Sequence, residues 1–455
     1  MSRPRTTPRT PSRSTVEWTN WARTERTTPL RFERPRDVES LVRVVTGAGP
    51  SPVRVVGAGH SFTGAAATDG IMVSLDDVAD VERVQPRPDG TTHVTVGAGI
   101  RLGALNRALA LHGLAMRNLG DVDRQSIAGA ISTGTHGTGA RLGGLASQVV
   151  GLRVVTAAGE VLEVDADDHG DLFQAARLGL GAVGLIAAVT IEAVPAFSLE
   201  AVEEPWPLER VLDALEGPDG LVESNGHVEF YWFPHTRRAL TKRNNCVDPR
   251  SPGAAPPLGQ VRGWLDDELL SNTVFEATNR LTAVARGLTP MVNQVAARAL
   301  SARRFTAPSF EVFVTPRRVR FREMEYAVPR AVLVDVLAEV DRWIRRTGEH
   351  VPFPVEVRFA APDDVWLSPA YARESAYVAV HQYIRLPYRR YFSAVERIMA
   401  EVDGRPHWGK LHWLEAERLA ALYPRFADFL AVRSAQDPAG RFANPYTERV
   451  FGPRG

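Results

Sequence analysis

Short apolar runs, rich in β-branched residues, alternate with glycine turns along the first part of the chain. Runs of this kind, bounded by turn residues, predict β-strands. Between them, Leu102, Leu105 and Leu109 recur at a spacing that predicts an amphipathic helix. The predicted strands are 53–56, 71–75, 93–96, 149–156, 161–164 and 185–194. We therefore expect an α+β unit that extends to about Pro195.

The pattern changes after Pro195, where longer amphipathic stretches are interspersed with apolar runs. We expect a second domain to begin there. Four prolines exclude regular structure from segment 247–259, which we interpret as a surface loop. The predicted elements are helices at 208–215 and 279–302 and strands at 228–233, 309–314, 354–360 and 377–384.

Composition narrows the class of protein. The chain has 455 residues, of which 44% are hydrophobic and 24% charged, and this length suits two interlocked domains. The formal net charge of +1, without a long basic block in the folded part, argues against nucleic acid and for a small-molecule partner. The single cysteine, Cys246, excludes an intramolecular disulfide and fits a reducing cytosol. No Cys/His spacing resembles a zinc site, so no metal is expected.

Two segments bear on membranes and targeting. Residues 1–15 are rich in Arg, Ser, Thr and Pro and have no apolar core, so we expect a disordered basic tail and not a secretory signal. The weakly polar run 178–189 is interrupted by three glycines and is too short to cross a bilayer. Contact with a membrane is then expected to be peripheral at most.

The turn after the first of these strands points to a nucleotide cofactor. Gly57 and Gly59 have no Cβ, so their backbone can lie against a pyrophosphate and present its N–H groups. A nicotinamide-type fingerprint does not fit, because Phe62 stands where its third glycine would be and no long amphipathic helix follows. His60 supplies a nucleophile that can bond to a cofactor. We expect a flavin here.

A second segment dense in glycine and hydroxyl side chains extends from Gly120 to Gly139. Its small residues let the backbone pass close to a large flat ligand, while Ser126 and Thr133 can bond to phosphates or to a ring edge. A purely structural turn is the alternative. The presence of two such segments in one domain favours the cofactor.

Charged residues in the later strands are candidates for catalysis. Glu356 and Arg358 are two positions apart in a predicted strand, so their side chains leave the same face about 7 Å apart along the chain. Burying such a pair is costly unless the two groups are used or satisfy each other, and a structural ion pair is the alternative. His381 and Tyr383 repeat this spacing, and Lys410 adds a cation near a compact turn.

Together these motifs resemble the aldonolactone oxidoreductases of the vanillyl-alcohol-oxidase superfamily of FAD-linked oxidases. The likeness extends from about Trp18 to Tyr446 and is greatest for bacterial L-gulono-1,4-lactone dehydrogenases and oxidases, with D-arabinono-1,4-lactone oxidase and alditol oxidase as close relatives. The motifs that carry it are Gly57-x-Gly59-His60-Ser61, Gly129 with Thr133-Gly134-Thr135-His136-Gly137, Glu356-x-Arg358 and His407-Trp408-Gly409-Lys410.

The resemblance implies a two-subdomain FAD-binding domain of the vanillyl-alcohol-oxidase type with an α+β cap domain over the flavin ring. The C-terminal strip, which includes Asn444-Pro445-Tyr446, is expected to return to the FAD domain. The expected divisions are a tail at 1–15, the FAD-binding domain at 16–195, the cap or substrate domain at 196–405 and the returning segment at 406–455.

The resemblance also implies roles for individual residues. His60 corresponds to the histidine that is covalently bonded to the flavin 8α-methyl group. The implied FAD contacts are Val56, Gly57, Ala58, Gly59, His60, Ser61, Gly120, Ser126, Gly129, Thr133, Gly134, Thr135, His136 and Ile186. The implied catalytic residues are Glu356, Arg358, His381 and Lys410, and the substrate-binding residues are Asp121, Glu356, Arg358, Tyr383 and Lys410. His381 is expected to accept the hydroxyl proton and Tyr383 to orient the sugar.

The implied activity is FAD-dependent oxidation of L-gulono-, L-galactono- or D-arabinono-1,4-lactone in an ascorbate-like pathway, in the cytoplasm or peripherally at a membrane. Relatives that exclude oxygen carry an alanine where this chain aligns Gly120, so we expect oxygen to reach the flavin, while a quinone or cytochrome remains an alternative acceptor. A second hypothesis is an alditol oxidase that produces hydrogen peroxide from xylitol or sorbitol. A third hypothesis is a flavin-binding protein without catalytic activity.

Overall fold

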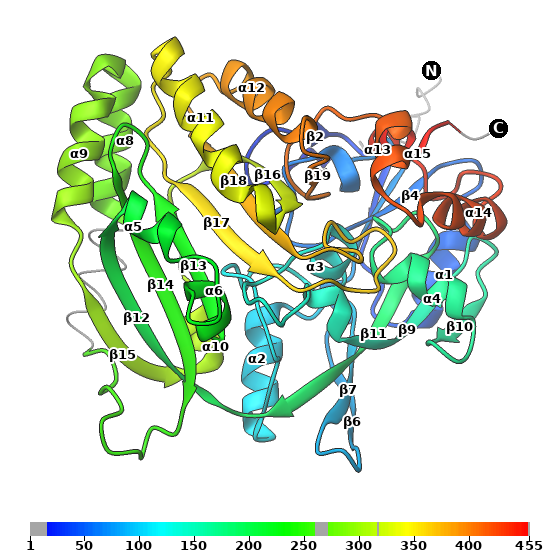
Figure 1. Cartoon of the computed structure of the whole chain (residues 1–455). Coiled ribbons are helices and arrows are strands. Elements are labelled where there is room, and N and C mark those ends of the chain that lie inside the picture. The colour runs from blue at the N-terminus through cyan, green and yellow to red at the C-terminus, as the bar shows by residue number, and fades with distance from the viewer. Residues whose placement is uncertain (1–15, 260–271, 316–317, 454–455) are drawn as a thin grey trace, which may run out of the picture.

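The computed structural model describes residues 16–259, 272–315 and 318–453. Among these residues the strands form two large sheets, a small parallel sheet and a two-stranded hairpin (Figure 1). The expected basic tail at 1–15 lies outside the described residues. No helix in the described part of the chain combines the length and the apolar character that a membrane span needs.

The parallel sheet ends at the glycine turn that the sequence singled out. Its strand order is β3-β5-β4, and α1 connects β3 to β4 over the sheet, as parallel strands require. The turn at 57–59 follows β4 directly, so it lies at the carboxyl end of that strand. The elements up to this sheet are β1 (Trp18–Thr19), β2 (Arg26–Thr27), β3 (Arg31–Glu33), α1 (Val38–Thr46), β4 (Val53–Val56), η1 (Gly64–Ala66) and β5 (Ile71–Ser74).

A six-stranded antiparallel sheet lies beside it, with strand order β10-β9-β11-β7-β6 and β8 paired to β11. Its apolar side chains share one core with the parallel sheet and with the helices that follow β7 and β10. The elements are β6 (Val81–Pro86), β7 (Thr92–Gly97), α2 (Leu102–Leu111), β8 (Leu114–Ala115), α3 (Ile127–Thr133), η2 (Leu145–Gln148), β9 (Val149–Val155), β10 (Val161–Val164), α4 (Gly170–Arg177) and β11 (Leu185–Pro195).

The second large sheet has eight strands in the order β15-β12-β14-β13-β17-β18-β16-β19. Helices α11 and α12 pack against one of its faces (Figure 1). The strands are β12 (Ser198–Pro207), β13 (His227–Trp232), β14 (Arg238–Val247), β15 (Arg303–Pro308), β16 (Phe321–Pro329), β17 (Val355–Ala360), β18 (Ser375–Tyr383) and β19 (Arg405–Pro406). The helices are α5 (Leu208–Asp213), α6 (Leu221–Ser224), α8 (Phe275–Val284), η4 (Arg286–Leu288), α9 (Thr289–Ala299), α10 (Ser309–Phe313), η5 (Arg330–Val332), α11 (Leu333–Thr347) and α12 (Arg389–Ala400).

Strand alternation separates apolar from charged side chains in this sheet. In β17, Val355, Val357 and Phe359 belong to the core under the helices, so Glu356 and Arg358 must leave the opposite face. The same alternation sends Val228, Met324 and Val378 of β13, β16 and β18 to the helices and Glu229, Glu323 and Glu325 the other way. The face turned away from the helices therefore collects the charges.

The last part of the chain returns to the core of the first two sheets. Trp408, Phe429 and Phe451 pack there together with side chains of α1 and α4. The buried guanidinium of Arg54 on β4 donates to the backbone oxygens of Ala65, Leu180, Gly181 and Phe442, the last at 2.7 Å. The returning helices are α13 (Ala416–Leu422), α14 (Phe426–Gln436) and α15 (Pro445–Phe451).

The strands predicted in the first part of the chain are confirmed, and so are those near 228–233, 354–360 and 377–384. Segment 309–314 was expected to be a strand, but it contains the helix α10. The strand here is β15, which ends at Pro308, and Ser309, Val312 and Phe313 are then buried at helical spacing. The helix predicted at 279–302 is two helices: α8 ends at Val284, η4 follows, and Pro290 lies in the first turn of α9, where its missing N–H is tolerated. Of the loop expected at 247–259, Val247 ends β14 and 248–259 has no regular structure.

Arg54 tests how strongly the returning segment is held. We expect Arg54→Met to lower the free energy of unfolding by about 3 kcal/mol, because it keeps the apolar stem but leaves buried carbonyl oxygens without their donors. Urea denaturation of the purified protein measures this change. The control is Arg43→Met, whose side chain is 68% exposed and which should shift the free energy by less than about 0.5 kcal/mol. Equal stability of the two variants would contradict the role of Arg54.

Candidate active site

Two adjoining cavities lie along the first two sheets, and the second of them also borders the charged face of the eight-stranded sheet. The first is lined by the turn after β4, by the start of α3 and by the segment around Ile186. The second is lined by residues of β16 and β17 and by the segment before Lys410. His60, Ser61, Gln125 and Thr133 line both cavities, so the two are joined at the glycine turn.

Small residues and bare backbone form the wall of the first cavity. A Cβ added at Gly57 would lie 2.4 Å from Ser126 Oγ, and Gly59 has a positive φ of 68° that favours glycine. Ser126 caps α3 by accepting from the Gly129 N–H, which brings both into the same wall. This narrow, amide-lined space fits the phosphates and adenosine of a dinucleotide. FAD is therefore compatible with the residues present.

Most predicted FAD contacts reach one of the cavities. Gly134 reaches neither: it ends α3 in the left-handed conformation, with a φ of 82°, and its role is that of a helix cap. The residues on the first cavity are Val56, Gly57, Ala58, Gly59, His60, Ser61, Ser126, Gly129, Thr133 and Ile186, and those on the second include Gly120, Thr135 and His136.

His60 lies where the cavities meet. Burial lowers the pKa of its imidazole to about 4, and the positive charges of Lys410 and Arg101 act in the same direction. The ring stacks on Trp21, with 5.7 Å between the ring centroids. At neutral pH the ring is uncharged, so a nitrogen lone pair is available as a nucleophile.

The sheet brings Glu356 and Arg358 together as an ion pair facing the second cavity. Antiparallel pairing of β13 with β17 sets Glu229 opposite Arg358, whose Nε lies 2.9 Å from Glu229 Oε2. Asp121 Oδ2 lies 3.4 Å from Arg358 Nη2. Burial would lower the pKa of Arg358, but these three carboxylates raise it well above its ordinary value, so it is a permanent cation.

Lys410 also lines the second cavity and forms an ion pair with Glu323 on β16. Burial alone would raise the pKa of Glu323, but Lys410 and His381 hold it well below its usual range. The sequence interpretation missed Glu323, Glu325 and Glu229. A signal for the first two was present, since they alternate with the apolar Met324 and Tyr326 in the same way that Glu356 and Arg358 alternate with valines.

The sequence around these cavities matches known protein families. Residues 189–450 match the family described as D-arabinono-1,4-lactone oxidase, and residues 29–165 match the FAD binding domain. The first match alone covers more than half of the chain. The chain belongs to the D-arabinono-1,4-lactone oxidase family. It is an FAD-dependent oxidoreductase of the vanillyl-alcohol-oxidase superfamily, as the motifs indicated.

Family members of known name match nearly the whole chain. L-gulono-1,4-lactone dehydrogenase of Mycobacterium tuberculosis is 40% identical over 96% of this chain and 99% of its own length. L-gulonolactone oxidase of Bos taurus is 34% identical over 96% of this chain and 98% of its own length. A mutant cholesterol oxidase of Brevibacterium sterolicum shares the fold, with a TM-score of 0.79, 18% identity and coverage of 99% of this chain and 100% of that one.

Two of the residues that the family resemblance implied, Tyr383 for substrate binding and His381 for catalysis, do not line the second cavity. Tyr383 is buried against Phe321 and Phe353, and its hydroxyl donates to Glu276 Oε1 at 2.8 Å, away from the cavity. His381 leaves the same face of β18 as expected, but it lies behind Glu323, with 3.5 Å between Nε2 and Oε1. The spacing identified the correct face of the strand, but on that face Glu323 lies in front of His381 and the Tyr383 hydroxyl is turned toward Glu276.

Proposed function

We propose that this enzyme oxidises a sugar 1,4-lactone, either L-gulono-, L-galactono- or D-arabinono-1,4-lactone. The observation that carries the proposal is the ion pair of Glu356 and Arg358 on the same cavity as His60 and Lys410. Charged donors and acceptors lie side by side there, as a ligand with several hydroxyl groups requires. The names of the relatives at 40% and 34% identity add support.

In this proposal each charged side chain has a separate task. Bound FAD supplies the acceptor for the substrate hydride. Glu356 accepts from substrate hydroxyls and Arg358 donates to them, so the carbon that is oxidised is held in one orientation. Lys410 stabilises negative charge that develops on the substrate oxygen. Asp121, 3.4 Å from Arg358, holds the guanidinium in place and borders the substrate.

The hydroxyl proton must leave as the hydride leaves. His381 was expected to take it directly, but it does not line the cavity. We propose that Glu323, which does, relays the proton to His381, because the low pKa of Glu323 keeps it ionised but unable to hold the proton and His381 Nε2 lies 3.5 Å from Glu323 Oε1. A role for Tyr383 in orienting the sugar has no support in this geometry, because its hydroxyl is bonded to Glu276.

Anaerobic reduction tests the proposal. Mixing the oxidised enzyme with L-gulono-1,4-lactone should bleach its visible flavin absorbance rapidly, whereas xylitol should not. We expect Glu356→Gln to slow this reduction about 10- to 100-fold, because a charge-assisted bond to substrate becomes a neutral one. Tyr383→Phe is the matched control and should leave the rate unchanged.

The alternative substrates give distinct results in the same experiment. Bleaching by xylitol and not by the lactone would identify an alditol oxidase, an activity named for a relative that is 32% identical over 94% of this chain. No bleaching by any lactone or polyol would favour a flavin-binding protein without catalysis.

We also propose that His60 carries the flavin covalently. The uncharged ring at the junction of the cavities supports this, because its lone pair is free to attack a carbon. We expect the flavin of the wild-type enzyme to stay with the protein after acid precipitation, whereas His60→Ala releases all of it. His112→Ala, on the exposed end of α2, is the control. Release of flavin from the wild type would contradict the linkage.

We further propose that oxygen reaches the reduced flavin past Gly120, although a quinone or cytochrome can serve as acceptor too. An alanine Cβ at this position would lie 3.1 Å from the His136 carbonyl oxygen and from Thr135 Cγ2, so it narrows the passage without a severe clash. We expect Gly120→Ala to slow reoxidation by oxygen at least tenfold. Reduction by substrate and reoxidation by an artificial dye are the controls and should change little. An unchanged oxygen rate would refute the gate.

The remaining proposals concern the cell. We propose a cytoplasmic enzyme that serves an ascorbate-like pathway and touches a membrane peripherally at most. Exposed apolar side chains on α8 and α9 support a peripheral contact. They are Leu281, Val284, Met291 and Val295.

A further inference from the structure

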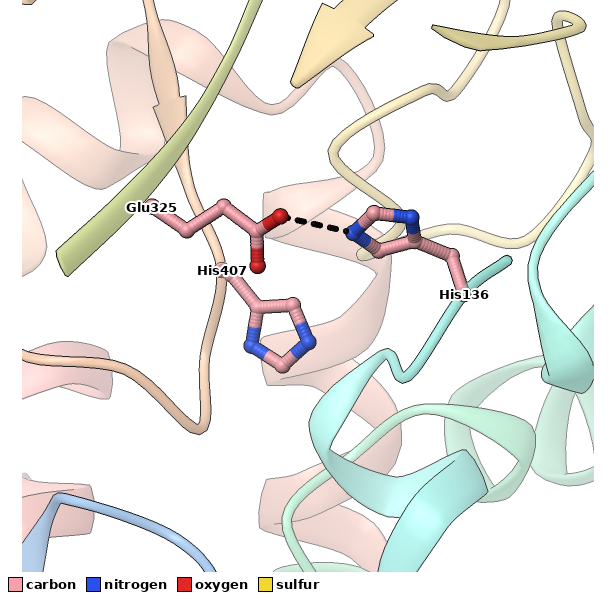
Figure 2. A group of neighbouring side chains, drawn as sticks. All are labelled: His136, Glu325 and His407. Atoms are coloured by element: carbon pink, nitrogen blue, oxygen red, sulfur yellow. Dashed lines mark ion pairs between the residues drawn. The ribbon is translucent and has the colours of Figure 1, made fainter. Parts of the chain in front are cut away.

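His136, Glu325 and His407 form a buried cluster in the wall of the second cavity (Figure 2). Glu325 lies on the charged face of β16, two positions after Glu323. His136 follows α3, and its Nε2 lies 3.2 Å from Glu325 Oε1, as the dashed line in Figure 2 shows. The proposed chemistry of substrate oxidation does not use these three side chains.

By donor type the cluster resembles a site for a divalent cation, but its hydrogen bonds argue against one. His407 Nδ1 lies 3.0 Å from the Gly409 N–H and accepts from it. The proton of a neutral His407 ring is then on Nε2, so neither nitrogen has a lone pair left for a metal. Burial lowers the pKa of His407 to about 3, which keeps this ring neutral.

The hydrogen bonds of His136 require a different protonation state. Its Nδ1 lies 2.8 Å from the Gly137 carbonyl oxygen, which can only accept, so Nδ1 carries a proton. Its Nε2 faces a carboxylate oxygen, which also accepts unless it is protonated. A neutral His136 beside an ionised Glu325 would set two lone pairs against each other. The pair therefore holds one additional proton.

Two observations assign this proton to His136. The pKa of Glu325 is about 2 in spite of burial, and the positive charge of Lys410 lowers it in addition to the contact with His136, so the carboxylate is ionised. Tyr377 stacks on the His136 ring with 3.6 Å between centroids, an arrangement that favours a cation. Burial keeps the phenol of Tyr377 neutral, because it raises its pKa well above the ordinary value.

The charged and titratable groups around His136 come from three elements. Glu325 lies on β16, Tyr377 on β18, and His407 and Lys410 on the segment after β19. Lys410 would repel a second cation, but it is paired with Glu323. Glu325 is thus the group whose charge matches that of His136.

We propose that protonated His136 and ionised Glu325 form a pair without net charge. Because the charges cancel, the Glu325 carboxylate can lie in the wall of the flavin cavity without opposing flavin reduction. Reduction adds negative charge to the cofactor, and a bare Glu325 carboxylate in a buried site would disfavour it. His136 is a positioning residue, because it acts on the flavin through Glu325, whose negative charge it cancels. The inference rests on FAD binding and not on which substrate is oxidised.

The midpoint potential of the bound flavin tests the proposal by a double-mutant cycle. We expect His136→Gln to leave Glu325 uncompensated and to lower the equilibrium constant for two-electron reduction at least tenfold, about 30 mV. Adding Glu325→Gln to it removes the charge and should bring the constant back to within twofold of wild type. Glu396→Gln, which removes a carboxylate that lies near β16 and accepts from Tyr326, is the control.

Imidazole ¹⁵N spectra of the flavin-loaded enzyme give a second readout that does not depend on the potential. We expect His136 to be doubly protonated at pH 7 in the wild type and neutral in Glu325→Gln. A neutral His136 in the wild type, or an unchanged potential in His136→Gln, would overturn the proposal. Stoichiometric Zn²⁺ binding that is lost in Glu325→Gln would also overturn it, in favour of a metal centre.

Discussion

Buried charge is the constraint on which the rest of this structure depends. Within the described residues, β13, β16 and β17 present four buried glutamates on the face of the sheet away from its helices, namely Glu229, Glu323, Glu325 and Glu356. Removing a carboxylate from water costs several kcal/mol unless a cation lies beside it. The sheet supplies two of the cations, Lys242 and Arg358. The cations that pair with Glu323 and Glu325 come from segments outside the sheet.

This division of partners couples the sheet to the rest of the molecule. Lys410 belongs to the returning C-terminal segment and His136 to the segment after α3, so each pair forms only when its own segment has docked on the sheet. Trp408, two residues before Lys410, anchors that segment by donating to the Leu367 carbonyl oxygen at 2.7 Å. Charge pairing thus fixes the cavity at the junction of three parts of the chain. Burial, together with the positive charge of Lys410, also keeps the ring of His60 unprotonated.

Much of this arrangement could be predicted from local sequence. Period-two alternation identified β17 and the shared face of Glu356 and Arg358, and paired glycines identified the turn at the first cavity. The predictions that were wrong depended on contacts between residues far apart in sequence or on where a strand ends. His381 and Tyr383 leave the expected face, yet the register of β18 against β16 sets His381 opposite Glu323 and moves Tyr383 toward Phe321. Segment 309–314 has strand-like composition, but the strand it was expected to form had already ended at Pro308.

The pairing of charges also bears on which ligands the second cavity can accept. Arg358, Lys410 and His136, which line this cavity, each already contact a glutamate of this sheet. A substrate carboxylate would have to compete with a side chain that is held beside its cation at high effective concentration. A neutral molecule with several hydroxyl groups meets no such competition, because a hydroxyl can donate to a carboxylate or accept from a cation without taking the place of a charged partner. The electrostatics therefore favour a lactone or a polyol over the open-chain acid. The shape of the cavity wall then determines whether the cyclic lactone or the open-chain polyol binds better.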